Sequence, residues 1–313
     1  MSEHAGGQAD GRRAGGPLRR WLVRAGIAAA ILGVIGAGAL VFGAYLGERK
    51  MARQVPVPAS TVALPEDARS LDRGRYLFLS RGCTECHGVD GGGRPVVEDG
   101  NGMRVHAPDI TPANKAVAAY QVADWVRVIR HGVKPDGRPA IVMPSEDYAR
   151  LTDADLGALI AYLRRMPPAK GSPAVVELPM LVKALYAAGV IRDAAEKIDH
   201  RLPPPEPVPE APSREHGAYV AHACIGCHGA DFAGGRIPGA PPDWPPASDL
   251  RPGGPIMAYA DAQALSAMFR SGTRPDGTAV SRVMPFVALK EMSDVDVAAV
   301  FEFLRSLPPE GSR

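Results

Sequence analysis

Two stretches of the chain share the pattern Cys-x-x-Cys-His, at residues 83–87 and 224–228. Two thiols three positions apart can each form a thioether with one vinyl group of the same porphyrin, and the next imidazole can then reach the iron. This pattern is the attachment signal for c-type haem. The sequence therefore predicts two covalently bound haems. The thioether positions are Cys83, Cys86, Cys224 and Cys227, and the proximal ligands are His87 and His228.

Each motif is followed by a methionine at the same distance, Met143 in one case and Met284 in the other. Each Met lies 56 positions after the motif histidine and precedes a proline. A lone Met is usually core filler, but the repeated spacing predicts a second axial ligand, and a thioether is a soft ligand that suits haem iron. His106 is an alternative at the first iron. Two further methionines are alternatives that break the repeat, Met103 and Met257.

All four cysteines lie in the two motifs, so none remains for a disulfide or a catalytic thiol. Zinc ribbons place their Cys-x-x-Cys pairs about 15–20 residues apart, whereas Cys86 and Cys224 are 138 positions apart. The 313 residues carry a net charge of +2, which gives no case for a nucleic-acid partner. We expect no catalytic residue, because Asp136 and Asp276 each sit in a Pro-Asp-Gly turn.

Residues 1–24 are rich in Gly and Arg and are predicted to be a disordered cytoplasmic tail. Residues 25–47 carry no charge, and as a helix they would be about 35 Å long, enough to cross a hydrocarbon core of about 30 Å. A cleaved signal peptide is the alternative, but its apolar region is usually about 7–15 residues long. The arginines before the span favour a cytoplasmic N-terminus. We therefore expect a single-pass anchor in the inner membrane, with both haem motifs in the periplasm, where c-type haem is attached.

The rest of the chain divides into two modules, and the expected fold class is all-α, with two tandem domains after one transmembrane helix. In the first module, helices are predicted over residues 73–81, over residues 120–130 and after the N-cap Thr152. An amphipathic helix is predicted over residues 181–197, with a stiff proline-rich stretch after it. The expected segments are a tether at 48–67, the first module at 68–168, a connector at 169–211 and the second module at 212–308.

The second module repeats the first at an offset of 140 to 143 positions, which indicates a duplicated domain. The matched positions include Gly74 with Gly217, and residues 151–156 with residues 292–297. Each module resembles a class I cytochrome c domain. In that family the first and last helices cross where a small residue meets an aromatic one. The resemblance implies that Gly74 meets Tyr162 and that Gly217 meets Phe303.

The first module also resembles the cytochrome c subunits of membrane-bound alcohol and gluconate dehydrogenases. The resemblance rests on residues 107–112, 131–139 and 142–144. Those subunits generally carry three haems, whereas this chain has two motifs and an N-terminal apolar run. The resemblance implies redox protein partners, which are a dehydrogenase subunit, another cytochrome or an oxidase.

Two irons with both axial positions filled can exchange electrons but offer no open position to a substrate. We therefore expect a relay of single electrons between a dehydrogenase or quinol donor and a cytochrome or terminal oxidase. One alternative is a haem enzyme of the peroxidase or thiosulfate-oxidising type, which needs an open iron or a reactive ligand. The other alternative is the dihaem subunit of a haem-copper oxidase.

Overall fold

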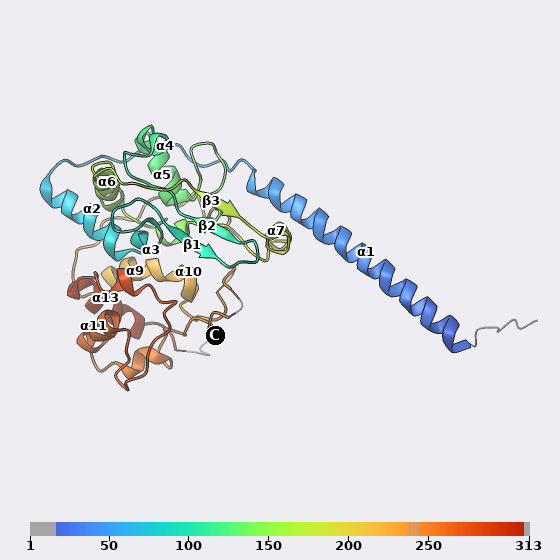
Figure 1. The fold of residues 1–313 in the computed structure, drawn as a ribbon. Helices are drawn as coiled ribbons and strands as arrows, with labels where there is room; N and C mark the ends of the chain where they lie inside the picture. Colours follow the sequence, from blue (N-terminus) through green and yellow to red (C-terminus); the bar gives the residue numbers. More distant parts are fainter. Residues whose placement is uncertain (1–16, 238, 242, 310–313) are drawn as a thin grey trace, which may run out of the picture.

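The computed structural model describes residues 17–237, 239–241 and 243–309, and residues 1–16 of the predicted tail lie outside these ranges. Helix α1 (Pro17–Met51) projects from a body formed by the other elements (Figure 1). Among the described residues it is the one helix long and apolar enough to cross a membrane. Residues 17–24 are helical, so the prediction of disorder there was wrong. Pro17 suits the first helical turn, and no helix breaker follows it before Gly26.

Two helices form the frame of the first module, α2 (Ala68–Ser80) and α6 (Asp153–Leu163). Helix α2 begins earlier than predicted because Asp67 caps it, accepting a hydrogen bond from the Ser70 backbone N–H at 2.9 Å. Helix α6 begins where the sequence predicts, since the Thr152 hydroxyl accepts the N–H of Asp155 at 3.1 Å. Four short helical elements lie between them: α3 (Cys83–His87), α4 (Lys115–Ala118), α5 (Val122–His131) and the 3₁₀ turn η1 (Ser145–Asp147).

The second module has the same frame, built by α9 (Arg214–Ala221) and α13 (Asp294–Arg305). The Ser293 side chain caps α13 by accepting the N–H of Asp296 at 3.1 Å, as Thr152 caps α6. Each module encloses an apolar core of its own. The elements between the two framing helices are η2 (His222–Cys224), α10 (Ile225–His228), η3 (Pro255–Ala258), α11 (Ala262–Ser271) and α12 (Phe286–Leu289).

The framing helices of each module cross at a glycine. A Cβ atom placed on Gly74 would lie 2.8 Å from the Cβ of Tyr162, and one placed on Gly217 would lie 2.6 Å from the Cβ of Phe303. Both values are closer than side chains tolerate, so only glycine permits this approach of the two helices. The structure thus confirms the two contacts that the resemblance to class I cytochromes c implies.

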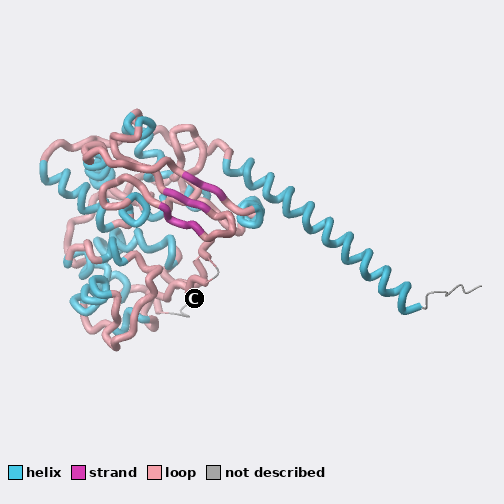
Figure 2. Tube along the Cα trace, viewed as in Figure 1, coloured by secondary structure: helices cyan, strands magenta, loops and turns pink. Residues whose placement is uncertain are grey.

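A small antiparallel sheet interrupts the helical fold, in the order β1 (Pro95–Glu98), β2 (Arg104–His106), β3 (Val175–Glu177). Figure 2 shows its three strands beside the end of α1. Val105 pairs with Val97 on one side and with Val176 on the other. The fold is therefore mostly helical with one small sheet, which the all-α expectation did not include. Three short strands, the third from a distant segment, leave too little alternation in the sequence to predict.

The two segments that flank the first module pack against it. Of the tether predicted over 48–67, residues 48–51 belong to α1. Residues 52–66 run along the first module, where Val62 is buried in its core and the N–H of Val55 donates to the Gly137 carbonyl at 2.9 Å. The connector contains β3 and two short helices, α7 (Met180–Ala187) and α8 (Ala194–Lys197). These replace the single helix predicted over 181–197, because Gly189 adopts a left-handed φ of 75° after α7.

Candidate haem sites and their interface

The first Cys-x-x-Cys-His motif lies on the wall of a cavity of about 960 Å³ in the first module. Cys83, Cys86 and His87 line the cavity from α3, and Met143 lines it from the loop before η1. The remaining lining is largely aliphatic and aromatic, with contributions from Trp125, Tyr120, Tyr148, Ile110, Val128 and Leu159. An apolar cavity of this size with a few convergent polar groups is typical of a cofactor site. The residues present therefore fit a porphyrin attached through the two cysteines.

One ring nitrogen of His87 is held by the backbone. Its Nδ1 lies 2.9 Å from the carbonyl oxygen of Pro108, which can only accept a hydrogen bond, so Nδ1 carries the proton and Nε2 is left to bind a metal. Burial lowers the pKa of His87, and the bond to Pro108 offsets this only in part. The imidazole is therefore neutral near pH 7, which is the form that ligates iron.

Met143 and the alternative ligands of the first module lie in different surroundings. His106 also lines the cavity, but its Nε2 lies 2.7 Å from Oε1 of Glu98. Strand β2, which ends at His106, leads directly to Pro108, and the Pro108 carbonyl oxygen accepts the hydrogen bond from His87. Met103 lies in the turn between β1 and β2 and is not among the residues that line the cavity. Met143 thus has the most suitable position among the three candidates.

The second module repeats the hydrogen bond between the motif histidine and a backbone carbonyl, with a different residue supplying the carbonyl. His228 Nδ1 lies 2.8 Å from the carbonyl oxygen of Ser248, at the position that corresponds to Pro108. Burial lowers the pKa of His228, against a smaller opposing effect of this hydrogen bond. Cys224 and Met284 both pack against the apolar core of the second module, whereas the alternative Met257 is half exposed. The backbone thus presents the second motif histidine in the same way as the first.

Comparison with known proteins supports this assignment of the two modules. Residues 69–163 match the family described as cytochrome c oxidase, cbb3-type, subunit III, and residues 215–308 match the cytochrome c family. The chain is a dihaem cytochrome c. It carries two covalently bound c-type haems with iron, one for each matched domain.

Several curated cytochrome subunits are similar to this dihaem cytochrome. The fructose dehydrogenase cytochrome subunit of Gluconobacter japonicus is 26% identical over 81% of this chain and 54% of its own length. The gluconate 2-dehydrogenase cytochrome c subunit of Pantoea cypripedii is 27% identical over 79% of this chain and 62% of its own length. The cbb3-type oxidase subunit CcoP of Helicobacter pylori is 31% identical over 38% of this chain and 36% of its own. The dihaem cytochrome thus spans little more than half of the two dehydrogenase subunits.

The two modules of the cytochrome are joined by a tyrosine from each first helix. The hydroxyl of Tyr76 in α2 donates to Oδ2 of Asp296 in α13 at 2.6 Å, and it accepts the Ser293 N–H at 3.0 Å. Tyr76 thus binds the N-terminal turn of the last helix of the other module. In Figure 1 the second module, in orange and red, lies directly beside the first.

The reverse contact uses the corresponding residues. The hydroxyl of Tyr219 in α9 donates to Oδ2 of Asp155 in α6 at 2.6 Å and accepts the N–H of Thr152 at 3.3 Å. Each module therefore inserts its first-helix tyrosine into the capped end of the last helix of the other. The interface has approximate twofold symmetry, as expected when two copies of one domain meet through the same surface.

The two haem-attachment helices lie at this interface. The backbone N–H of Gly226, within the second motif, donates to Oδ1 of Asp147 in η1 at 2.8 Å. The N–H of Ala288 in α12 donates to Oε1 of Glu85, within the first motif, at 3.3 Å. The elements η1 and α12 directly follow the two Met-Pro pairs. Each haem-attachment helix thus contacts the segment that carries the axial Met candidate of the other module.

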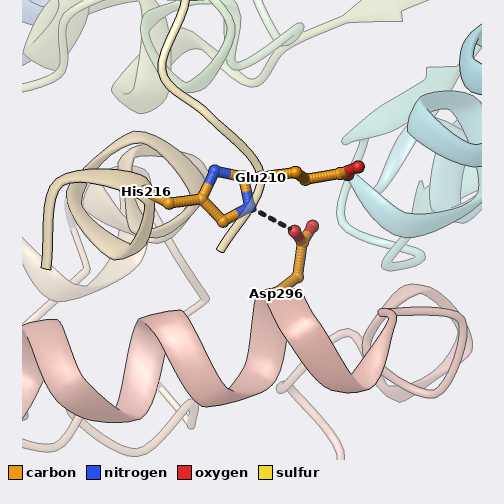
Figure 3. A group of neighbouring side chains, drawn as sticks. All are labelled: Glu210, His216 and Asp296. Carbon is orange, nitrogen blue, oxygen red and sulfur yellow. Dashed lines mark hydrogen bonds and ion pairs between the residues drawn. The ribbon is translucent and has the colours of Figure 1, made fainter. Parts of the chain in front are cut away.

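A group of charged side chains, in which His216 and Asp296 are buried and Glu210 is exposed, supports the tyrosine contacts (Figure 3). His216 Nε2 lies 2.7 Å from Oδ1 of Asp296, with Glu210 beside them. Arg81 binds Asp296 at 2.7 Å, and Arg73 binds Glu210 at 2.6 Å. Burial raises the pKa of Asp296, but Arg81 and the surrounding hydrogen bonds outweigh it and lower the pKa overall. Because two guanidinium groups already neutralise the carboxylates, we interpret the group as an ion-pair network and not as a metal site.

The interface residues were not recognised from the sequence, although a signal was present. The repeat contains Tyr76 with Tyr219 and Asp155 with Asp296 at matched positions. A polar pair that recurs in both copies of a duplicated domain can mark a surface where the copies meet. Nothing in one copy alone indicates that its partner lies in the other copy.

Proposed function

We propose that the dihaem cytochrome relays single electrons through two six-coordinate haems. In this proposal His87 and Met143 ligate the first iron, and His228 and Met284 ligate the second. Each haem supplies an iron that cycles between the ferrous and ferric states, while the chain supplies ligands, burial and orientation. The thioether bonds are formed by Cys83, Cys86, Cys224 and Cys227.

The observation that carries the proposal is the position of the two attachment helices at the interface between modules. Glu85 of the first motif and Gly226 of the second each hydrogen-bond to the other module. An electron relay needs its two haems close together, because electrons must leave one haem and reach the next within the same molecule.

We place α1 in the inner membrane and both modules in the periplasm. The most apolar part of α1 has no residue buried against the body, and the arginines at its start suit a cytoplasmic end. The electron donor would be a dehydrogenase subunit or a quinol-oxidising complex, and the acceptor another cytochrome or a terminal oxidase. The similarity to the fructose and gluconate dehydrogenase cytochrome subunits favours a dehydrogenase donor.

A second candidate is a cytochrome subunit of a cbb3-type oxidase. The match of residues 69–163 to subunit III of that family and the similarity to CcoP favour it. Purification of the tagged chain from its native membranes distinguishes the two. Co-purification of a dehydrogenase catalytic subunit supports the first reading, and co-purification of a subunit holding both haem and copper supports the second.

The oxidised spectrum tests the proposed ligands. A haem with His and Met ligands has a weak absorption band at the red end of the visible spectrum that vanishes on reduction. We expect this band at a strength corresponding to two haems, and no change when cyanide is added briefly. Rapid cyanide binding to one haem of the native protein would instead indicate an open iron and favour a haem enzyme.

A further inference from the structure

Helix α7 is a surface helix with almost no polar side chain. Its sequence is Met-Leu-Val-Lys-Ala-Leu-Tyr-Ala, with Lys183 as its one charge. Met180 and Leu181, in its first turn, are 54% and 59% exposed, and Val190 just beyond it is 64% exposed. A helix at an aqueous surface normally carries a polar face, and one that is apolar nearly all round is buried in a core or in a membrane.

Helix α7 lies against the last turns of the apolar part of α1. A Cβ atom placed on Gly43 would lie 2.9 Å from the Cβ of Ala184, and one placed on Gly47 would lie 2.3 Å from the carbonyl oxygen of Lys183. The two glycines, four positions apart, form the small-residue surface on which α7 packs. Gly43 is about 27 Å along the helix from Ala25, close to the far edge of a hydrocarbon core of about 30 Å.

Three basic side chains near this junction, Lys183, Lys50 and Arg53, are directed toward the protein. Lys183 pairs with Glu48, so the only charge of α7 is neutralised by α1. Lys50 donates to the Tyr186 carbonyl at 2.8 Å, and Arg53 binds Asp193 at 2.8 Å. The exposed side of α7 therefore lacks an unpaired charge among its described residues, and α7 is fixed to the end of α1 by one ion pair within the helix and another just after it.

We propose that α7 lies in the periplasmic headgroup region of the bilayer, with Met180 and Leu181 inserted among the lipid acyl chains. The proposal rests on the membrane anchoring by α1 that is part of the proposed function. A single transmembrane helix would leave the body free to rotate about it, whereas α7 adds a second contact with the membrane and fixes which side faces the lipid. The cavity of the first module includes Glu48 and Met51 of α1 in its lining, so this contact would hold that cavity next to the membrane surface.

Photo-crosslinking of the full chain in lipid nanodiscs tests the proposal. A benzophenone amino acid replaces Leu181 in one variant and Met180 in a second, so that failure of one variant to fold does not end the test. The same probe at Val34, in the middle of α1, reports whether α1 spans the bilayer. The probe at Val295, an exposed position in α13 of the second module, is the matched water-facing control. Haem content confirms that each variant is folded.

We expect lipid adducts at Leu181 and Met180 with yields comparable to that at Val34 and several-fold above that at Val295. Adducts at Val34 alone would overturn the role of α7 while leaving the anchor intact. No lipid adduct at Val34 would overturn the anchoring on which the proposal rests. Crosslinking of Leu181 to a second copy of the chain would show that α7 is a dimer contact and would also overturn the proposal.

Discussion

At the scale of single residues, a backbone carbonyl oxygen orients the motif histidine of each module, and the side chain of the residue that supplies it differs between the modules. The motif histidines bind the carbonyl oxygens of Pro108 and Ser248, two residues with unrelated side chains. The sequence predicts the cysteines, histidines and methionines as haem ligands because their spacing recurs. It could not predict which backbone carbonyl orients each imidazole, since every residue provides a carbonyl.

Replacement of Met143 by Ala should open one coordination position of the first haem. That haem should stay attached through its thioethers, its reduction potential should fall because a soft ligand is replaced by water, and cyanide should bind quickly. Redox titration and cyanide difference spectra measure these changes. The change Met284→Ala is the matched control, with the same effects on the other haem. Unchanged potential and spectrum after Met143→Ala would mean that another residue, with His106 first in line, is the ligand.

The carboxyl group of Asp147 should make the potential of the second haem depend on pH. Burial, followed by the charge of Glu146, raises the pKa of Asp147 to about 8. Below that pH the group is neutral, and above it the group carries a negative charge beside the second motif, which favours the ferric state. The potential should therefore fall as pH rises through 8, as followed by redox titration at several pH values.

Asn at position 147 keeps an oxygen to accept the Gly226 N–H but cannot ionise, so Asp147→Asn should remove this pH step. Asp276 is the matched control in the second module, because hydrogen bonds with Thr278 lower its pKa and it stays ionised over this range. Asp276→Asn should leave the step in place. A step that persists in Asp147→Asn would assign it to another group.

At the scale of secondary structure, the sequence predicts elements best where a local signal exists. Thr152 caps α6 as its position suggests, and Gly132 ends α5 in the left-handed conformation, with φ of 65°. The sheet was missed because tertiary contacts stabilise it, and the helix predicted over 181–197 is divided into α7 and α8 at Gly189. Strand β3 exists only because residues 175–177, about 70 positions further along the chain, pair with β2.

The helix crossing of each module should depend on its glycine. In Gly74→Ala the added methyl group would lie 2.1 Å from the Ala158 carbonyl oxygen, so the helices must separate. We expect the first module to lose about 1–3 kcal/mol of unfolding free energy, measured by denaturant titration of haem absorbance. Gly36→Ala, in α1 where nothing lies within 4 Å, is the control and should have no effect on unfolding. An unchanged midpoint for Gly74→Ala would contradict the close packing described for α2 and α6.

At the scale of the whole molecule, the duplicated domains form one unit through reciprocal contacts. The sequence shows the duplication but not the docking, because a repeat fixes which residues are equivalent and leaves their relative placement open. The buried Asp296 illustrates this point. It binds Tyr76 and Arg81 of the first module as well as His216 of its own, and no local pattern reveals the first two partners.

Removal of the interface hydroxyls should weaken the docking of the modules. In Tyr76→Phe the buried Asp296 loses one hydrogen bond while keeping that from Arg81, and a hydrogen bond to a charged group contributes about 1.5–3 kcal/mol. We expect the joint thermal transition of the two modules to separate into two, most clearly in the double variant with Tyr219→Phe. Tyr259, buried in the core of the second module, supplies the control, and Tyr259→Phe should keep one transition. A single unchanged transition in the double variant would argue against the role of these contacts.

The central claim is that the two haems exchange electrons within one molecule across this interface. The direct measurement is a flash-reduction experiment in which, on average, less than one electron is delivered per molecule and the redistribution between haems is followed optically. We predict a redistribution rate that does not change when the protein is diluted, and a slower rate in the double variant Tyr76→Phe, Tyr219→Phe. A rate that falls in proportion to protein concentration would show transfer between molecules and would contradict the account.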